Sequence, residues 1–158
     1  MPTDQITIRT ATPADRDVLV EMQCLLSAET EHQPLDTTSA RLGIDHLLHT
    51  PAIGYYLIAE DPIHTIVGCL LVLSEWSTWQ NAEMWWLHDV YVLPAWRQAG
   101  VFRRLYDHVR LEVMANPRVL GLRLYVNQDN ASARRTYERL GMQDEHWALY
   151  EWLSTTDG

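Results

Sequence analysis

The residues best suited to chemistry lie in two segments, and the first is a short loop rich in arginine and glycine. Residues 86–93 form an apolar strand pattern that breaks at Pro94, and the loop after it opens a basic helix. A helix start presents unpaired backbone N–H groups and the positive end of the helix dipole, so it suits a pyrophosphate. An ordinary strand–turn–helix junction with solvated arginines is the alternative. The residues expected to wrap the anion with their amides are Arg97, Gln98, Ala99, Gly100, Val101 and Phe102.

The second segment is NQDNASARRTYERLGM, which follows an apolar stretch ending at Val126. Asn130, Ala133, Tyr137 and Leu140 lie at i, i+3, i+7 and i+10, so they share one face of a helix. Asn130 is a suitable cap for the start of that helix, and the glycine that follows Leu140 is a suitable end. Tyr137 is therefore expected to face whatever Asn130 faces.

Together, these segments resemble the GNAT superfamily of acetyl-CoA-dependent N-acetyltransferases, and the resemblance covers most of the chain. In that family a strand ends in a V-x-P step, an R/Q-x-x-G-x-G/A loop holds the coenzyme A pyrophosphate, and an N-x-x-A-x-x-x-Y-x-x-x-G-F helix supplies a tyrosine beside the thioester sulfur. The matching sequences here are Val92-Leu93-Pro94, residues 97–102 and residues 130–142. The resemblance implies acetyl-CoA as the co-substrate. It also implies an α+β fold whose mixed, partly splayed sheet, flanked by helices, opens between two central strands to admit the pantetheine arm.

Phe102 departs from this pattern, because it stands where the family has glycine or alanine. Phe102, Leu105, Val109 and Val113 recur at helical spacing. The phenylalanine ring is therefore expected to point into the core and leave its backbone N–H available to a phosphate. A ring turned toward the loop would instead impair cofactor binding.

Acetyl transfer from a thioester to an amine needs a base, an oxyanion donor and an acid for the departing thiolate. Tyrosine, with an ordinary pKa near ~10, keeps its proton at neutral pH, so Tyr137 is expected to be the general acid. A tyrosine that merely packs on its helix face is the alternative. The resemblance places the base on the strand before the loop, where the glutamate of the spermidine/spermine acetyltransferases corresponds to His88, in LHDVYV. An imidazole can accept a proton at physiological pH, although His88 also fits a hydrogen-bonded core histidine.

The neighbouring Asp89 is expected on the opposite face of that strand, which makes it the weaker candidate for the base. The oxyanion donor is expected to be a backbone N–H of Val90 or Val92, where splaying removes a ladder partner. In the family these strand-end positions, here Val90, Tyr91 and Val92, also hydrogen-bond the pantetheine.

Four of the seven tryptophans lie on the hairpin that enters this strand, close to two glutamates. Aromatic faces beside carboxylates attract ammonium groups, so Trp76 and Trp79 are candidate substrate-binding residues. Ordinary core or surface packing is the alternative, and at least one of the four is expected to follow it because adjacent strand residues face opposite ways.

The formal net charge of −9 argues against nucleic acid as the main partner and is compatible with a cationic substrate, although acidic surfaces usually serve solubility. Cys24 and Cys69 lie in apolar contexts without metal-type spacing, so reduced thiols and no metal are expected. Neither a signal peptide nor a membrane span is evident. These features favour a cytoplasmic protein.

The elements that position these residues form one domain over residues 1–158. Apolar patterning and turn signals predict strands over 5–9, 54–59, 65–73, 83–92, 121–126 and 147–153. Helices are predicted from a capping-box start at Thr12 to about Ala28, over 38–48, after Gly100 to about Asn116, and around Tyr137. Glu29, Glu31 and His32 are assigned to the loop after the first helix. The apolar last strand, Trp147 to Leu153, suits pairing between the subunits of a homodimer.

The predicted function is transfer of an acetyl group from acetyl-CoA to a primary amine of a small molecule by direct attack. A polyamine, a diamine and an amino-acid-like compound are the candidate acceptors. Two other interpretations stay open. One is a non-catalytic acyl-CoA-binding regulatory domain, against which Tyr137 and Asn130 argue. The other is acetylation of protein N-termini or side chains, which needs a flatter groove than the bulky tryptophans favour.

Overall fold

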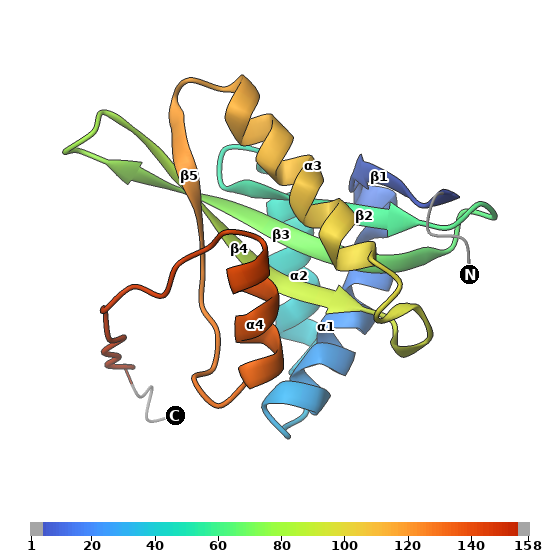
Figure 1. Ribbon diagram of the computed structural model, residues 1–158. Coiled ribbons are helices and arrows are strands. Elements are labelled where there is room, and N and C mark those ends of the chain that lie inside the picture. Colours follow the sequence, from blue (N-terminus) through green and yellow to red (C-terminus); the bar gives the residue numbers. More distant parts are fainter. Residues whose placement is uncertain (1–4, 155–158) are drawn as a thin grey trace. The chain divides into compact units, whose positions relative to one another are not determined.

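A computed structural model describes residues 5–154 of the chain (Figure 1). Residues up to Tyr125 form one compact unit, and residues from Val126 onward form a second. The elements of the first unit, in chain order, are β1 (Thr7–Thr10), a 3-10 turn (Pro13–Asp15), α1 (Arg16–Thr30), α2 (Thr37–Leu48), β2 (Gly54–Glu60), β3 (Ile66–Ser77), β4 (Ala82–Val92), a 3-10 turn (Pro94–Trp96), α3 (Val101–Ala115) and β5 (Val119–Leu124). The second unit contains α4 (Ala131–Arg139).

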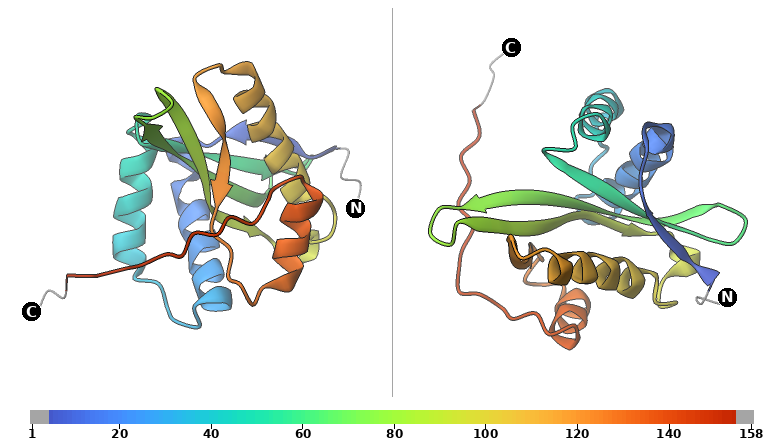
Figure 2. Two further views of the ribbon diagram at one scale, coloured as in Figure 1. Left: turned by 60° about the vertical axis from the view of Figure 1, so that its left-hand side comes forward. Right: turned by 90° about the horizontal axis from the view of Figure 1, so that it is seen from above.

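One five-stranded sheet, in the order β1-β2-β3-β4-β5, organises the first unit. The pairs from β1 to β4 are antiparallel, whereas β5 runs parallel to β4. Seen from above, α1 and α2 cover one face of this sheet and α3 covers the other (Figure 2). This arrangement confirms the predicted α+β fold with a mixed, open sheet.

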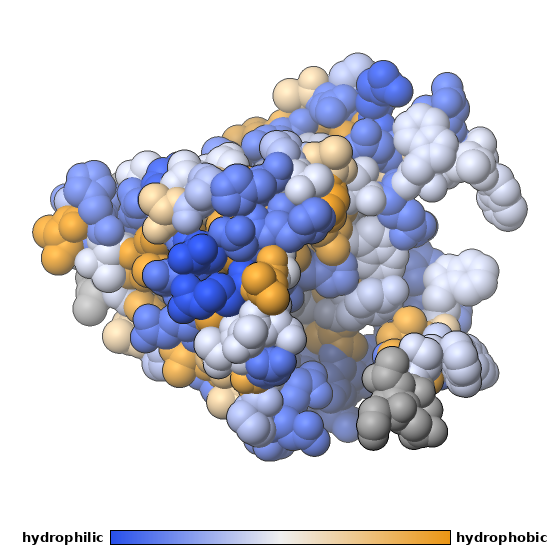
Figure 3. Space-filling view, turned by 180° about the vertical axis from the view of Figure 1, so that it is seen from behind, coloured by the Kyte–Doolittle hydropathy of each residue, from blue (hydrophilic) through white to orange (hydrophobic). Residues whose placement is uncertain are grey.

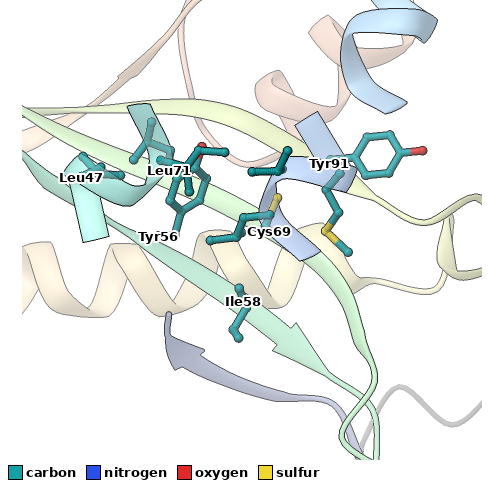
Figure 4. Close-up of a cluster of buried hydrophobic side chains, with 10 residues drawn as sticks. Leu47, Tyr56, Ile58, Cys69, Leu71 and Tyr91 are labelled. Atoms are coloured by element: carbon teal, nitrogen blue, oxygen red, sulfur yellow. The ribbon is translucent and has the colours of Figure 1, made fainter. Parts of the chain in front are cut away.

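The core beneath α1 and α2 is built from alternate residues of the strands and one face of each helix (Figure 4). Leu19 and Met22 of α1 and Leu47 of α2 meet Tyr56 and Ile58 of β2 there. Alternation along a strand brings every second side chain to this face, which is why β3 contributes Cys69 and Leu71. The core thus fixes which strand residues look toward α1 and α2.

On the other face, α3 buries a stripe formed by Val101, Leu105 and Val109. The sequence predicted a buried stripe from Phe102 to Val113. The prediction was wrong at its start, where Val101 is buried instead of Phe102, and Val113 is only partly buried. Phe102 lies half-buried beside the stripe, with its ring centroid 6.1 Å from that of Tyr106 one turn along the helix. Val101 occupies the core position because α3 begins there, directly after Gly100.

The local start and stop signals in the sequence act as expected. The Thr12 backbone N–H donates to Asp15 Oδ2 at 2.7 Å, which completes one half of the predicted capping box. The Asn130 side chain accepts a hydrogen bond from the Ala133 N–H at 3.1 Å and caps α4, and Gly141 adopts a φ of 88° just past its end.

Several further sequence predictions need correction, and one is the end of β3, which runs to Ser77, four residues beyond the predicted end. Residues 147–153 form no strand, because a strand exists only where its backbone pairs with a neighbour, and no described residue pairs with this segment. β5 begins at Val119, two residues earlier than predicted, and Glu29 belongs to the last turn of α1 instead of the following loop. None of the helices within residues 5–154 is long and apolar enough to span a membrane.

Candidate active site

The strands β4 and β5 separate at the middle of β4. Their pairing runs from Glu83 with Val119 to Leu87 with Leu124. Within the described chain the residues from His88 to Val92 have no partner in β5, and His88, Tyr91 and Val92 pair with β3. This half of β4 therefore presents an edge with no strand beside it, where backbone amides can hydrogen-bond a ligand. The opening expected from the sequence is present, although β5 is the edge strand of the described sheet instead of a central one.

A β-bulge lies at this point of separation. Asp89 has a φ of 52°, and the register jumps from Leu71 opposite His88 to Cys69 opposite Tyr91. Asp89 and Val90 of β4 thus lie opposite a single residue of β3, Leu70. The extra residue breaks the alternation that assigned Asp89 to the far face. The Tyr56 hydroxyl donates to Asp89 Oδ2 at 2.5 Å, which places this carboxylate on the α1/α2 face.

The prediction that Asp89 points away from His88 was therefore wrong. Leu71 is the cross-strand neighbour of His88 and belongs to the α1/α2 face, as Tyr56 does. Directly opposed residues share a face, so His88 and Asp89, although adjacent in sequence, both look toward α1 and α2.

Two buried side chains hold the bulge in place through the Asp89 carbonyl oxygen. Gln23 Nε2 of α1 donates to it at 3.3 Å, and the Cys69 thiol donates at 3.6 Å. Burial raises the pKa of Cys69 to about 12, so the thiol keeps the proton that it donates. The backbone distortion is thus fixed by groups on two other elements.

An open groove of about 470 Å³ lies between α1, α2 and the sheet on this face. Figure 3 shows the molecule from this side, where hydrophilic residues predominate and hydrophobic residues form separate patches. We call this cavity the α1/α2 groove. Its lining residues are Gln23, Leu26, Ser27, Thr30, Glu31, Leu35, Ala40, Gly43, Ile44, Leu47, Tyr56, Leu71 and Asp89.

His88 lies in an aromatic cluster next to the groove. Its ring stacks on Trp86, with centroids 6.2 Å apart and an interplanar angle of 24°, and lies 6.2 Å from Tyr125. The half-buried imidazole is thus oriented by ring contacts, and its cross-strand neighbour Leu71 lines the groove.

The predicted anion loop has the backbone geometry of an open helix start. Gln98 and Gly100 adopt positive φ values of 60° and 81°, and the first hydrogen bond of α3 runs from the Arg104 N–H to the Gly100 carbonyl. A helix start of this kind directs backbone N–H groups outward, where an anion is favoured. The Arg97 N–H is an exception in the predicted set, because it donates to the Pro94 carbonyl at 3.3 Å.

The Arg97 side chain turns away from that helix start, toward α1. Its Nε donates to the Val92 carbonyl at 3.0 Å, and its Nη2 lies 2.7 Å from Glu29 Oε2. Its guanidinium also lies 5.4 Å from the centroid of the Tyr91 ring, and the Tyr91 hydroxyl donates to Glu29. The Tyr91 and Arg97 donors lower the pKa of Glu29 and keep this carboxylate charged.

In the second unit, Tyr137 lies on the more buried face of α4. Tyr137, Ala133 and Leu140 are partly buried, whereas the flanking Glu138 and Arg139 are exposed. These are three of the four residues that the spacing placed on one face, and the fourth, Asn130, is exposed at the cap of the helix. Burial raises the pKa of Tyr137, so its hydroxyl holds a proton throughout the neutral range.

The two candidate tryptophans lie at the far end of the β3–β4 hairpin. Trp79 occupies the turn and is 96% exposed, and Trp76 is 48% exposed. Neither lines the α1/α2 groove. Of the other two tryptophans of the hairpin, the adjacent Trp85 and Trp86, Trp85 packs edge-on against Tyr55 on the other face of the sheet, as expected because adjacent strand residues face opposite ways.

Sequence reasoning missed the residues that shape the groove, above all Tyr56, Gln23 and Gly43. The available signal was the polar pair His88-Asp89 inside an otherwise apolar strand, because strict alternation would bury one of the two without a partner. Within residues 5–154 no group of three His, Cys, Asp or Glu side chains is placed to hold a metal ion.

Comparison with known proteins identifies the family. The family model described as the acetyltransferase (GNAT) family matches residues 19–142, so the chain belongs to this family of transferases. Acetyl-CoA is the acetyl donor that the family uses. No curated protein matches the chain.

Solved structures agree with this assignment. A possible acetyltransferase from Clostridium difficile 630 is 30% identical, with a TM-score of 0.89 over 95% of this chain and 98% of that one. A probable acetyltransferase is 20% identical, with a TM-score of 0.81 over 96% and 99% of the two chains. A predicted acetyltransferase from Clostridium acetobutylicum, solved with acetyl-CoA, is 18% identical, with a TM-score of 0.74 over 96% of each chain.

Proposed function

We propose that this protein transfers an acetyl group from acetyl-CoA to the primary amine of a small molecule. The observation that carries this proposal is the bulge at Asp89, which brings two adjacent side chains that can handle a proton or an ammonium group to the same face of the sheet, with Asp89 in the groove and His88 next to it. The bulge lies where β4 parts from β5, shortly before the helix start suited to a phosphate. Cofactor, acceptor and base can therefore converge there.

We propose that acetyl-CoA is held by the backbone. The amides of Gln98, Ala99, Gly100 and Val101, between Arg97 and Phe102, would bind the pyrophosphate, and the free edge of β4 at Val90, Tyr91 and Val92 would pair with the pantetheine. The solved neighbour with acetyl-CoA supports this ligand for the fold. Asn130 contributes by capping the helix that carries the proposed acid, Tyr137.

The proposed reaction is direct attack. An ammonium substrate gives one proton to the imidazole of His88, and the resulting amine nitrogen attacks the thioester carbonyl carbon. A backbone N–H of Val90 or Val92 stabilises the oxyanion of the intermediate. The carbon–sulfur bond then breaks, and Tyr137 donates its proton to the departing thiolate. The nitrogen of the collapsing intermediate still carries one proton more than an amide, and it returns this proton to the Tyr137 phenolate. The products are the acetamide and free coenzyme A.

The acceptor that we propose is a cationic small molecule. The spermidine/spermine-like sequence LHDVYV, the acidic surface and the exposed Trp76 and Trp79 are consistent with a cationic small molecule. The groove favours a small acceptor over a protein chain, because its volume of about 470 Å³ is that of a small-molecule site. A non-catalytic acyl-CoA-binding domain is disfavoured because both candidate proton-transfer residues, His88 and Tyr137, are present.

We further propose that residues 1–158 act as one domain, since the family match crosses the boundary between the two units. The free thiols Cys24 and Cys69 fit the reducing cytoplasm.

A homodimer would cover the exposed apolar segment 147–153, in which Trp147 is 88% and Tyr150 is 92% exposed. We propose that this segment pairs as a strand with a second copy. Tyr150→Pro would remove a backbone donor from such a pairing, so it should convert a dimer to a monomer in sedimentation. A wild-type monomer would contradict the proposal.

Mass spectrometry of an amine panel incubated with acetyl-CoA tests the proposed function. We expect at least one small amine to gain an acetyl group, with release of one equivalent of coenzyme A. Because the chain contains no lysine, acetylation of its own lysine side chains cannot obscure the product. Tight acetyl-CoA binding without acetylation of any amine would support the regulatory alternative, and acetylation of peptides alone would support the protein-modifying one.

A further inference from the structure

We infer that the acceptor is a primary amine with a single ammonium group and an apolar body, bound in the α1/α2 groove with its ammonium on the Asp89 carboxylate. This inference rests on the proposed function and specifies its substrate class. It is carried by the position of Asp89, the apolar walls of the groove and a glycine in one of those walls.

Asp89 can accept a further hydrogen bond at the floor of the groove. A carboxylate offers about four lone-pair sites, and the Tyr56 hydroxyl uses one of them at 2.5 Å. Burial and the negative charge of Asp89 raise the pKa of Tyr56, so this hydroxyl remains a donor. An ammonium group has three N–H donors and complements the oxygen sites that Tyr56 leaves open.

The groove walls suit one charge and an apolar body. Leu26, Ile44, Leu47 and Leu71 line the groove, and a hydrocarbon chain leaves water when it packs against them. A second ammonium along the same chain would be desolvated against these side chains. Glu31 also lines the groove, but it is exposed at the end of α1, where pairing with a charge in water contributes little.

Gly43 keeps one wall of the groove open. It lies in the interior of α2, where glycine destabilises a helix relative to alanine. Its backbone conformation does not require glycine, and a Cβ at this position would meet nothing within 4 Å. No packing constraint in the described structure thus explains the glycine, whereas space for a ligand does.

The first test compares primary amines as substrates. From ethylamine to hexylamine, kcat/KM should rise about three- to fourfold per added methylene, as burial of each CH₂ predicts. Butylamine should exceed 1,4-diaminobutane, which has the same carbon chain and a second ammonium, by at least tenfold. Preference for 1,4-diaminobutane or spermidine would overturn the inference and leave the proposed function intact, because an amine would still be acetylated.

The second test uses two phenylalanine variants of α2. Gly43→Phe should lower kcat/KM for hexylamine at least tenfold and spare ethylamine, because the ring fills the groove. Leu42→Phe is the matched control, since Leu42 is 67% exposed and does not line the groove. Should Gly43→Phe fail to fold, Gly43→Val provides a smaller obstruction of the same wall. Equal use of hexylamine by the Gly43 variant and the wild type would overturn the inference.

The third test needs no turnover. Calorimetry should detect hexylamine binding to the complex with coenzyme A, and Asp89→Asn should weaken it at least tenfold, because the amide carries no charge. Binding that depends on Asp89 but gives no acetylated product would sink the proposed function alone. Hexylamine binding that is unchanged in Asp89→Asn would sink the inference alone.

Discussion

Arg97 and Glu29 form an ion pair that ties the first residue of the proposed anion loop to the last turn of α1. Arg97 Nη2 lies 2.7 Å from one carboxylate oxygen of Glu29 and 3.0 Å from the other. The pair is partly exposed, so it contributes little to the stability of the fold. Its effect is geometric: the one arginine inside the loop is already engaged, which leaves the backbone amides as the main ligands for a phosphate.

Replacing Arg97 should accordingly have a modest effect. Arg97→Gln is expected to weaken acetyl-CoA binding less than tenfold in calorimetry, which corresponds to less than ~1.4 kcal/mol. The thermal midpoint should change little, because an exposed pair is lost. A larger loss of affinity with an intact fold would mean that the guanidinium leaves Glu29 to bind the cofactor.

Gly100 should matter far more to the cofactor. Gly100→Glu introduces a negative charge and a side chain at the helix start, so acetyl-CoA affinity should fall more than tenfold. Because Gly100 has a φ of 81°, any side chain there adds strain. Gly100→Asn is the control, since asparagine tolerates this conformation and carries no charge. Binding retained within about threefold in Gly100→Glu would contradict the assignment of the loop.

Tyr137→Phe removes the proposed proton donor and preserves the ring. Turnover of an identified amine should drop by about two orders of magnitude or more, with acetyl-CoA binding nearly unchanged. Burial raises the pKa of Tyr137. The proton is therefore present at every pH below the ordinary tyrosine value near ~10, and the loss should not depend on pH between 6 and 9. Near-normal turnover would exclude Tyr137 as the acid.

His88→Glu tests the base through the pH profile. Glutamic acid ordinarily titrates about two units below histidine, so the acidic limb of kcat/KM should move to lower pH while activity remains measurable. Glutamate can accept a proton in the same place, which a leucine cannot, so His88→Leu is the inactive comparison. Superimposable profiles of the wild type and His88→Glu would show that another group takes the proton.

Asp15 should contribute stability that depends on pH. Asp15 is a buried residue, 8% exposed. Its carboxylate is well paired, because both Nη atoms of Arg9 donate to it at 2.9 Å and the Thr12 N–H donates at 2.7 Å. Hydrogen bonds from charged groups are worth about 1.5–3 kcal/mol each, and exposure of Arg9 reduces this, so Asp15→Asn should cost about 2–3 kcal/mol at pH 7.

The sign of the effect follows from the Asp15 pKa, which Arg9 lowers in the folded state. The contribution is complete above the unfolded-state value near ~3.9 and is lost as pH falls through the lower folded-state value. Urea unfolding should therefore show the two proteins converging only below about pH 4. Asp17→Asn is the control, because Asp17 pairs with Arg16 and with Arg41 of α2 but its side chain is 67% exposed, so its loss should change stability little at any pH. A difference that already disappears between pH 7 and pH 5 would contradict this account.

Much of the fold follows from signals within a few residues of one another. Thr12 and Asp15 mark the start of α1, and Asn130 and Gly141 bound α4, because caps satisfy backbone groups locally. The loop before α3 is likewise a local pattern, since Gly100 provides the left-handed residue directly before the helix. These features, and the helices and strands that they delimit, are determined by the sequence itself.

Which side chains face the candidate active site is decided by the tertiary structure. Asp89 faces the groove because a β-bulge places two residues of β4 opposite one residue of β3. Gln23 and Cys69, which are distant in sequence, hold the Asp89 carbonyl in this position. No pattern within β4 encodes that register, since it depends on which strand pairs with it and what packs above it. The same reason explains residues 147–153: their alternation makes a strand possible, but only a neighbouring backbone can complete its hydrogen bonds.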